Sequence, residues 1–213
     1  MDGDYPRRYA LTSYQFDGNA EDYLVGRLVF KYMNGRRVLN LGCGPTEGIF
    51  GVFYPEAKEV VAVDLLRSNL DFSENKSHLI KPIIARARAY RLRYLSAMEN
   101  NPKTRYVMGD IRKRLGLGRF DSVMQIGAFG TLRSAKEFET AVRNSYHYLK
   151  RGGRLLMVNW VGRKGEIDCS RMYKPSLEKA GFRILEMHST SIGFNRYSKK
   201  EGYKKLIWAV AEK

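Results

Sequence analysis

The stretch that most constrains the fold of this chain is residues 37–48, with the sequence RVLNLGCGPTEG. It begins with a short apolar run, residues 38–41, of the length and composition of a buried parallel strand. Gly42 and Gly44 follow, and glycine lets the backbone turn sharply and leaves no Cβ to keep a ligand away. Pro45 suits the first turn of a helix, because it lacks only an N–H that this turn does not use. The order of strand, glycine turn and helix predicts the ligand crevice of a doubly wound α/β fold.

A second apolar run, residues 60–63, strengthens this prediction because it ends in an acid, Asp64. Asp64 lies 22 positions after Gly42, close to the offset of roughly 20 residues at which an acid meets a ribose hydroxyl in such folds. The glycine spacing, however, is G-x-G-x-x-x-G rather than the G-x-G-x-x-G of dinucleotide sites. Glu47 would also place like charge beside a pyrophosphate. The pattern is therefore not that of a dinucleotide site.

The stretch resembles motif I of the class I S-adenosylmethionine-dependent methyltransferases, commonly V-L-D-L-G-C-G-x-G, and the resemblance spans roughly residues 20–213. It implies S-adenosylmethionine as the cofactor and methyl transfer as the reaction. Asp64 is then expected to bind the ribose, and Leu65 is expected either to cover one face of the adenine or to pack in the core. One residue departs from the pattern. The acid usual at the centre of the first strand is Asn40 here, which loses the charge that would face the amino end of the cofactor, so we expect weaker affinity.

Two further strands carry expected site residues. After the third strand, residues 104–108, the family places an acid that accepts a hydrogen bond from the adenine amino group, and then a residue that packs beside the ring. Asp110 and Ile111 match these roles, although Asp110 is also a candidate N-cap for a short helix. The fourth strand, residues 121–126, contains Gln125, expected to position the substrate or the methionine end of the cofactor. The residues after this strand lack the Asp/Asn-Pro-Pro-Tyr/Phe pattern of enzymes that methylate exocyclic amines of bases.

The expected cofactor site therefore has nine residues at the carboxyl ends of the first four strands. They are Asn40, Gly42, Cys43, Gly44, Asp64, Leu65, Asp110, Ile111 and Gln125. No catalytic base is evident, because the three histidines, His78, His147 and His188, are isolated in the sequence. Candidates for the acceptor pocket are Tyr14, Gln125, Asn159 and Trp160.

The fold class expected from these features is α/β, with a doubly wound, mostly parallel seven-stranded sheet and an N-terminal helical extension. A length of 213 residues fits a single domain. We expect an N-terminal flap and helix in residues 1–35, the cofactor-binding core in residues 36–160, and a C-terminal helix and strand hairpin in residues 161–213. A helix over residues 133–149 is expected to be capped by the glycine turn at residues 152–153.

Cysteine and hydropathy patterns indicate the cellular environment expected for the protein. The two cysteines, Cys43 and Cys169, are far apart and lack CxxC spacing, so neither a disulfide framework nor a metal site is expected. No run of about 18 apolar residues suggests a membrane span, and the polar N-terminus lacks a signal core. The expected location is the cytoplasm.

The net charge of +16 implies attraction to polyanions. Residues 81–119 contain eleven Lys and Arg against two acids. An apolar stripe is expected on a helix there, formed by Ile83, Ala87, Tyr90, Tyr94 and Ala97, with Arg86, Arg88, Arg91 and Arg93 off it. This segment is either an RNA-binding face or a solvated helix face.

Taken together, these sequence features favour a methyltransferase acting on a small or medium-sized acceptor. The alternatives are an RNA methyltransferase and a non-catalytic Rossmann-like nucleic-acid-binding module.

Overall fold

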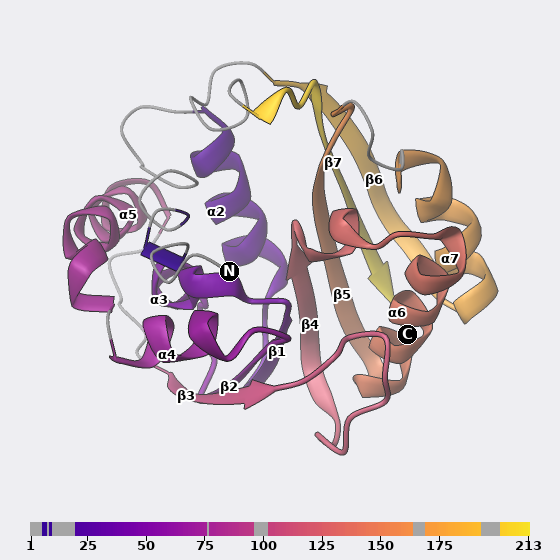
Figure 1. The fold of residues 1–213 in the computed structure, drawn as a ribbon, viewed down its shortest axis with the longest axis horizontal. Coiled ribbons are helices and arrows are strands. Elements are labelled where there is room, and N and C mark those ends of the chain that lie inside the picture. Colours follow the sequence, from indigo (N-terminus) through magenta and orange to yellow (C-terminus); the bar gives the residue numbers. More distant parts are fainter. Residues whose placement is uncertain are drawn as a thin grey trace.

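The computed structural model describes residues 6, 7, 9, 20–75, 77–95, 102–163, 169–192 and 201–213. Within these residues, seven strands form one sheet in the order β3-β2-β1-β4-β5-β7-β6 (Figure 1). The strands are β1 (Arg37–Leu41), β2 (Glu59–Asp64), β3 (Lys103–Met108), β4 (Phe120–Ile126), β5 (Leu149–Val161), β6 (Arg183–Ser191) and β7 (Lys205–Glu212). Strands β1 to β5 are parallel, and β7 is antiparallel to β5 and β6. The predicted mostly parallel, seven-stranded, doubly wound sheet is confirmed.

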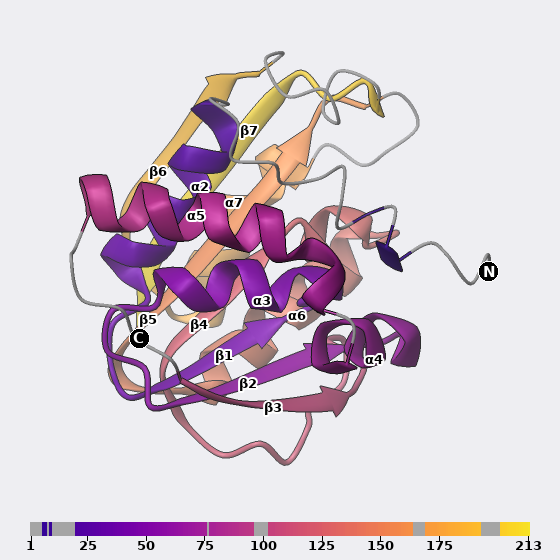
Figure 2. The same ribbon diagram turned by 90° about the vertical axis from the view of Figure 1, so that its left-hand side faces the viewer.

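Helices cover both faces of the sheet (Figure 2). The α-helices are α2 (Ala20–Tyr32), α3 (Glu47–Phe50), α4 (Arg67–Asn75), α5 (Lys81–Tyr94), α6 (Ala135–Tyr148) and α7 (Tyr173–Ala180). Short 3-10 turns are η1 (Gly44–Thr46), η2 (Gly51–Phe53), η3 (Ser77–Ile80), η4 (Ala128–Thr131) and η5 (Cys169–Met172). No helix in the described part of the chain combines the length and the apolar character needed to cross a membrane.

The alternation of side chains along the parallel strands separates two apolar cores. Val38 packs with residues of α2, α3 and α5 on one face, whereas the next residue, Leu39, packs with residues of α6 and α7 on the other. Both faces of the central strands are therefore buried, which explains why residues 60–63 are a continuous apolar run rather than an alternating one.

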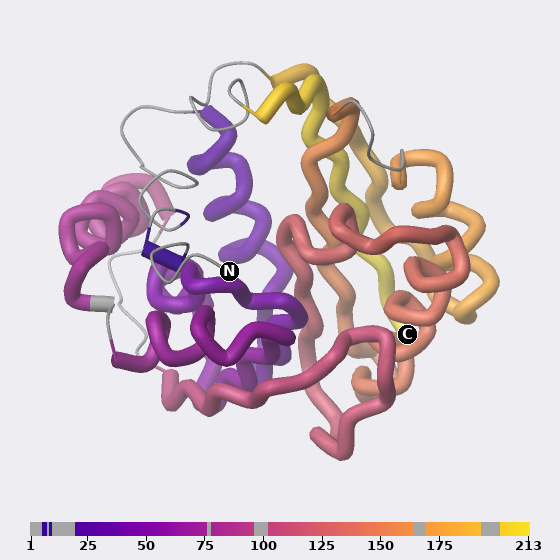
Figure 3. The backbone as a smooth tube through the Cα atoms, viewed as in Figure 1, coloured from indigo at the N-terminus to yellow at the C-terminus, as the bar shows by residue number. Residues whose placement is uncertain are grey.

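The order of the strands places the crevice expected from the glycine turn. The chain first forms β1, β2 and β3 with their helices, in indigo to magenta, and then β4 to β7, in pink to yellow (Figure 3). The strand order therefore reverses between β1 and β4. In open parallel sheets, ligands bind outside the carboxyl ends of the strands at this reversal.

The helix predicted after the glycine turn is interrupted. Instead of one continuous helix, the chain forms η1, the short helix α3 and η2. Gly48 and Gly51 lie within this segment, and glycine has a low helix propensity because its backbone loses more entropy on ordering. The turn therefore continues into a compact, irregular segment that packs beneath it.

The predicted glycine cap of α6 is wrong. The helix ends at Tyr148, and Leu149 is already extended and begins β5. Gly152 has a φ of +74° and donates its N–H to the carbonyl oxygen of Lys213 at 2.9 Å. The glycine turn thus lies at an irregular start of β5, where the pairing register with β4 shifts between Phe120 and Ser122.

The predicted apolar stripe on α5 is only partly correct, and its last residue, Ala97, lies outside the described residues. Ile83 and Ala87 are buried, but the third buried position is Arg91, which is 2% exposed. The Arg91 guanidinium lies 5.7 Å from the centre of the Phe30 ring. In contrast, Tyr94 is 61% exposed. The buried face of α5 is therefore rotated away from Tyr94, while Tyr90 stays half-buried against the core. The long Arg91 stem covers apolar surface of the neighbouring helix.

We expect Leu156→Ala to lower the free energy of unfolding by about 2–5 kcal/mol, because it removes buried methyl groups and leaves a cavity. Leu156 is fully buried at the centre of β5. Urea denaturation of Leu92→Ala is the matched control: Leu92 is exposed on α5, and its substitution should stay within about 0.5 kcal/mol of the wild type. Equal losses of stability in the two variants would contradict this packing.

Candidate functional site

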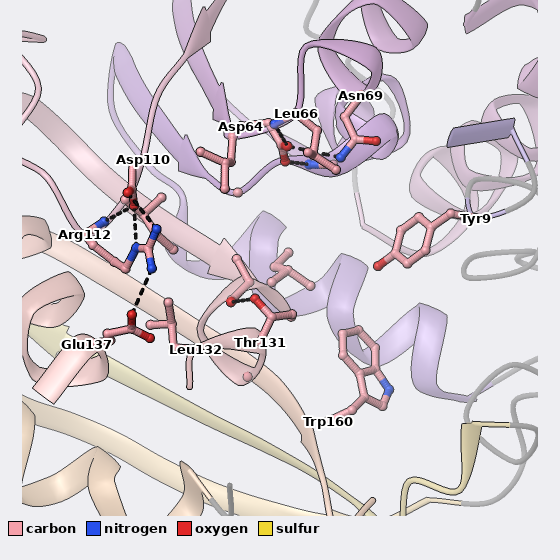
Figure 4. A pocket seen from close by; sticks show the side chains of 18 of the residues that line it. Tyr9, Asp64, Leu66, Asn69, Asp110, Arg112, Thr131, Leu132, Glu137 and Trp160 are labelled. Atoms are coloured by element: carbon pink, nitrogen blue, oxygen red, sulfur yellow. Dashed lines mark hydrogen bonds and ion pairs between the residues drawn. The ribbon is translucent and has the colours of Figure 1, made fainter. Parts of the chain in front are cut away.

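A cavity of about 670 Å³ opens at the carboxyl ends of the parallel strands. It lies at the reversal of strand order between β1 and β4. Six residues of the expected site line it: Gly42, Gly44, Asp64, Leu65, Asp110 and Ile111. The remaining three, Asn40, Cys43 and Gln125, are buried and do not line it. Figure 4 shows the arrangement: Asp110 lies at one end, Tyr9 and Trp160 lie at the other, and Asp64 lies between them.

The glycine turn forms one wall because both glycines adopt conformations that other residues disfavour. Gly42 has a φ of +68° and Gly44 a φ of +57°. A Cβ on Gly42 would lie 2.3 Å from the Cβ of Ala128, so the close approach of β1 and η4 also requires glycine. The N–H groups of Gly42 and Cys43 both donate to the carbonyl oxygen of Val63, at 2.7 and 2.9 Å. These bonds hold the turn against the end of β2.

Asp64 fixes the same turn through its side chain. Its Oδ2 accepts the N–H of Gly44 at 2.8 Å. Its Oδ1 accepts the N–H of Leu66 at 2.9 Å and a bond from Nδ2 of Asn69 at 3.1 Å. A carboxylate has roughly four acceptor positions, so Oδ2 keeps one for a ligand. No sequence pattern indicates Asn69, because its role depends on where α4 begins.

Asp110 is held by a forked ion pair. Nε and Nη2 of Arg112 lie 2.9 Å from the two carboxylate oxygens, and the Arg112 N–H also donates to Oδ1 at 2.9 Å. These hydrogen bonds hold the pKa of Asp110 below its usual value, so it is a carboxylate. Nη1 of Arg112 donates to Glu137 of α6 at 2.8 Å. Asp110 caps a turn rather than a short helix, and Arg112 and Glu137 anchor it against α6 (Figure 4).

Leu65 and Ile111, the two residues expected to contact the adenine ring, differ in exposure. Leu65 is 58% exposed although it is a large apolar side chain at the cavity wall. Ile111 is half-buried and packs on the core formed with α6. An exposed leucine beside a cavity gains by covering apolar surface of a ligand.

Beneath the glycine turn lies a buried polar cluster. Nδ2 of Asn40 donates to Oε2 of Glu47 at 2.5 Å, and the hydroxyl of Tyr54 donates to Oε1 at 3.1 Å. Burial raises the pKa of Glu47 to about 7. The sequence pattern puts Glu47 near the place of a pyrophosphate in a dinucleotide site, but the structure places it in the interior. An aspartate at position 40 would bring a second carboxylate against Glu47, so the asparagine has a local physical reason.

The other two residues that do not line the cavity shape its walls from behind. Oε1 of Gln125 accepts the N–H of Phe129 at 3.0 Å, which fixes the start of η4. Burial raises the pKa of the Cys43 thiol well above its usual value. Gln125 therefore lies behind the cavity wall rather than on it.

The end of the cavity away from Asp110 is lined by large planar side chains. Tyr9, Trp160 and Tyr203 line it, and the Tyr9 hydroxyl points inward (Figure 4). Nε1 of Trp160 donates to Oε2 of buried Glu21 at 3.2 Å, which fixes the indole. Of the four acceptor candidates, Trp160 is at the cavity, whereas Gln125 and Asn159 are buried behind it. Tyr14 lies outside the described residues, as does most of the predicted flap.

Tyr9 belongs to the N-terminal segment that is expected to form a flap. Tyr203 is not expected as a wall residue, because no local sequence pattern fixes the path of its segment. A general base is not evident there either. His78, His147 and His188 are all described, and none of the three lines the cavity. The site therefore offers hydrogen-bond acceptors, apolar walls and glycine backbone, which suits binding and orientation.

Neither a protein-family model nor a curated protein sequence matches this chain. Solved structures do match it. The N-methyltransferase NodS of Bradyrhizobium japonicum, in complex with S-adenosylhomocysteine, is 14% identical with a TM-score of 0.68, over 98% of this chain and 96% of that one. Magnesium protoporphyrin IX methyltransferase ChlM of Synechocystis, with bound S-adenosylmethionine, is 18% identical with a TM-score of 0.60, over 99% and 91%.

A third similar structure, the [4+2]-cyclase SpnF, is 16% identical with a TM-score of 0.61, over 89% of this chain and 80% of that one. These likenesses show that the chain has the Rossmann-like fold of the class I methyltransferases. Because a cyclase shares the fold, the fold alone does not fix the reaction, and the function has to be argued from the site.

The buried Glu47 predicts a pH-dependent stability. Its pKa is about 7 in the folded protein against 4.5 in the unfolded chain, so the folded state keeps a proton that the unfolded state has released. The resulting stabilisation is complete below pH 4.5 and is lost as the pH rises through 7. Relative to the wild type, Glu47→Gln should gain up to about 3 kcal/mol of stability at pH 8 compared with pH 5.

Urea denaturation at both pH values measures this difference. Glu56→Gln, at an exposed position on the loop before β2, is the control and should leave the pH dependence unchanged. Parallel pH profiles for the wild type and Glu47→Gln would show that Glu47 does not titrate in this range.

Proposed function

We propose that the chain binds S-adenosylmethionine in the cavity and transfers its methyl group to a small or medium-sized acceptor. The observation that carries the proposal is the convergence of the glycine turn, Asp64 and Asp110 on one cavity at the strand-order reversal. The three features come from separate parts of the chain, and each supplies a different group that a nucleoside ligand needs. The solved structures with bound S-adenosylmethionine or S-adenosylhomocysteine support the same ligand.

Each wall has a proposed role in binding. The free acceptor position of Asp64 takes a ribose hydroxyl, and Asp110 accepts from the adenine amino group. Leu65 and Ile111 pack on the adenine ring. The glycine turn, which includes the backbone of Cys43, allows close approach at the methionine end. This assignment uses both acids as acceptors, consistent with the low pKa of Asp110.

Asn40 contributes indirectly in this proposal. Its amide holds Glu47 beneath the turn and so supports the backbone that contacts the ligand. Gln125 likewise acts through the N–H of Phe129, by fixing η4 where it approaches Gly42.

The acceptor is proposed to bind at the end lined by Tyr9, Trp160 and Tyr203. Planar side chains with polar tips favour an acceptor that has a flat or apolar part and at least one hydrogen-bonding group. When bound, the sulfonium of the cofactor supplies an electrophilic methyl group. The chain orients the acceptor and excludes water, which are large contributions to the rate of such a displacement.

We assign no catalytic base. With no histidine at the cavity, the proposal favours an acceptor atom that is nucleophilic without prior deprotonation by the protein, such as a neutral amine. The alternative of a non-catalytic module with a vestigial pocket is less favoured, because the cavity and its two acids are intact. Cys43 and Cys169 are buried thiols that suit the reducing cytoplasm, which we propose as the location.

Leu65→Ala tests the binding mode. Because Leu65 is mostly exposed without a ligand, its loss should not affect folding but should remove apolar contact with the adenine. Burial of a leucine side chain is worth about 1.5–3 kcal/mol, so the Kd for S-adenosylhomocysteine should rise about 10- to 100-fold. Calorimetric titration measures it, with Leu92→Ala as the control for loss of an exposed leucine. Identical Kd values in the wild type and Leu65→Ala would refute the placement of the adenine.

Transfer itself is tested with S-adenosylmethionine labelled in the methyl group. The wild type should transfer label to one or more members of a panel of small amines, phenols and carboxylic acids, and Leu65→Ala should do so only at higher cofactor concentration. Binding of the cofactor without transfer to any of these classes would favour another reaction on the same fold.

A further inference from the structure

The exposed face of α5 has a composition that the cavity does not explain. Its sequence, KPIIARARAYRLRY, contains five basic residues and no acid. Arg86, Tyr90 and Tyr94 are spaced four residues apart, so they lie along one ridge of the helix. The helix packs beside α2, and both belong to the layer on one face of the sheet (Figure 2).

Three tyrosines form a column across α2 and α5. The rings of Tyr23 and Tyr90 are stacked, with centroids 4.3 Å apart and an interplanar angle of 16°. Tyr90 and Tyr94 follow at 5.2 Å and 41°. The column begins against the core and ends in solvent, since Tyr94 is 61% exposed. A purely structural role does not account for the last ring, because it buries little of its apolar surface.

Arginines surround this tyrosine column. The Arg93 guanidinium lies 5.1 Å from the centre of the Tyr94 ring. Arg86 is exposed one turn before Tyr90, and Arg27 is exposed one turn after Tyr23. Among the described residues, no carboxylate forms an ion pair with any of these three arginines.

The acids of α2 do not neutralise this surface from outside, and α5 contains no acid. The first turn of α2 contains Glu21 and Asp22, but both are buried, and Glu21 accepts the bond from Trp160. Among the described residues, the solvent-facing side of the tyrosine column is therefore cationic and aromatic at the same time.

We propose that the tyrosine column, with Arg27, Arg86 and Arg93, binds single-stranded RNA. Aromatic rings stack with unpaired bases whatever their sequence, and arginines neutralise the phosphates alongside. Unpaired bases in loops and ends are the part of RNA that such surfaces contact, because the bases of a duplex are stacked on one another. The net charge of +16 favours the encounter.

This surface is distinct from the cofactor cavity, and its binding of RNA requires neither the cofactor nor methyl transfer. The two are nevertheless linked through the first turn of α2, which holds Trp160 at the cavity through Glu21 and carries Tyr23 in the column. Because RNA binding requires neither the cofactor nor methyl transfer, it can be tested separately from the proposed reaction.

The test is fluorescence anisotropy of a labelled single-stranded RNA of mixed sequence, titrated with the full chain over a series of salt concentrations. The wild type should bind with a steep log–log salt dependence. Arg86→Ala/Arg93→Ala should reduce the slope by about 1.4, because each single-strand phosphate that is no longer neutralised lowers it by about 0.7. Tyr94→Ala should weaken binding about 5- to 150-fold, the range for removal of one stacked base. Tyr94→Phe keeps the ring and should bind like the wild type.

The matched control is Lys136→Ala/Arg143→Ala, which removes two exposed charges from α6 on the other face of the sheet. It should leave the slope and the affinity close to those of the wild type. Circular dichroism establishes that each variant is folded. The proposal is overturned if the control variant weakens binding as much as the α5 variant, if duplex RNA binds as tightly as the single strand, or if Tyr94→Ala has no effect. Binding to anionic vesicles without binding to the RNA would also overturn it.

Discussion

The carboxylate of Asp64 is the interaction on which the rest of the site depends. It accepts the Gly44 N–H from the turn after β1 and the Leu66 N–H from the turn after β2, together with the Asn69 amide. One side chain therefore fixes two neighbouring strand-to-helix turns relative to each other. Hydrogen bonds to a charged group contribute about 1.5–3 kcal/mol each, and this carboxylate is only 7% exposed. These hydrogen bonds to Asp64 set the distance between the two cavity walls that the turn after β1 and the turn after β2 form.

A second constraint acts from beneath the same turn. Glu47 is buried with Asn40 and Tyr54, and burial raises its pKa to about 7. A buried carboxyl is costly unless it is hydrogen-bonded or protonated, and here it has both neighbours as donors. The departure of Asn40 from the acid of the family pattern thus accompanies an acid seven residues later. We interpret the neutral Asn40 as an adjustment to the buried Glu47 beside it, rather than as a sign that the site cannot bind a ligand.

The sequence was sufficient for the parts of the structure that depend on regular strands. The sheet, its strand positions and the meeting of Asp64 and Asp110 at one edge follow from apolar runs that end in polar residues, because parallel strands bring their carboxyl ends together. The parts that depend on helix rotation or broken helices were not predictable in this way. The burial of Glu47 depends on an interrupted helix. The burial of Arg91 in place of Tyr94 depends on how α5 rotates against α2, and periodicity alone does not distinguish a long arginine stem from an apolar residue.

Asp64, having fixed the turns, still has an acceptor position, and the proposed function depends on this position binding the ribose of the cofactor. A crystal structure of the full chain with S-adenosylhomocysteine tests it most directly. We predict a ribose hydroxyl within hydrogen-bonding distance of Oδ2 of Asp64, with the Gly44 bond to the same oxygen retained and the adenine between Leu65 and Ile111. A ligand bound elsewhere, or one in this cavity whose ribose does not contact Asp64, would contradict this role of Asp64.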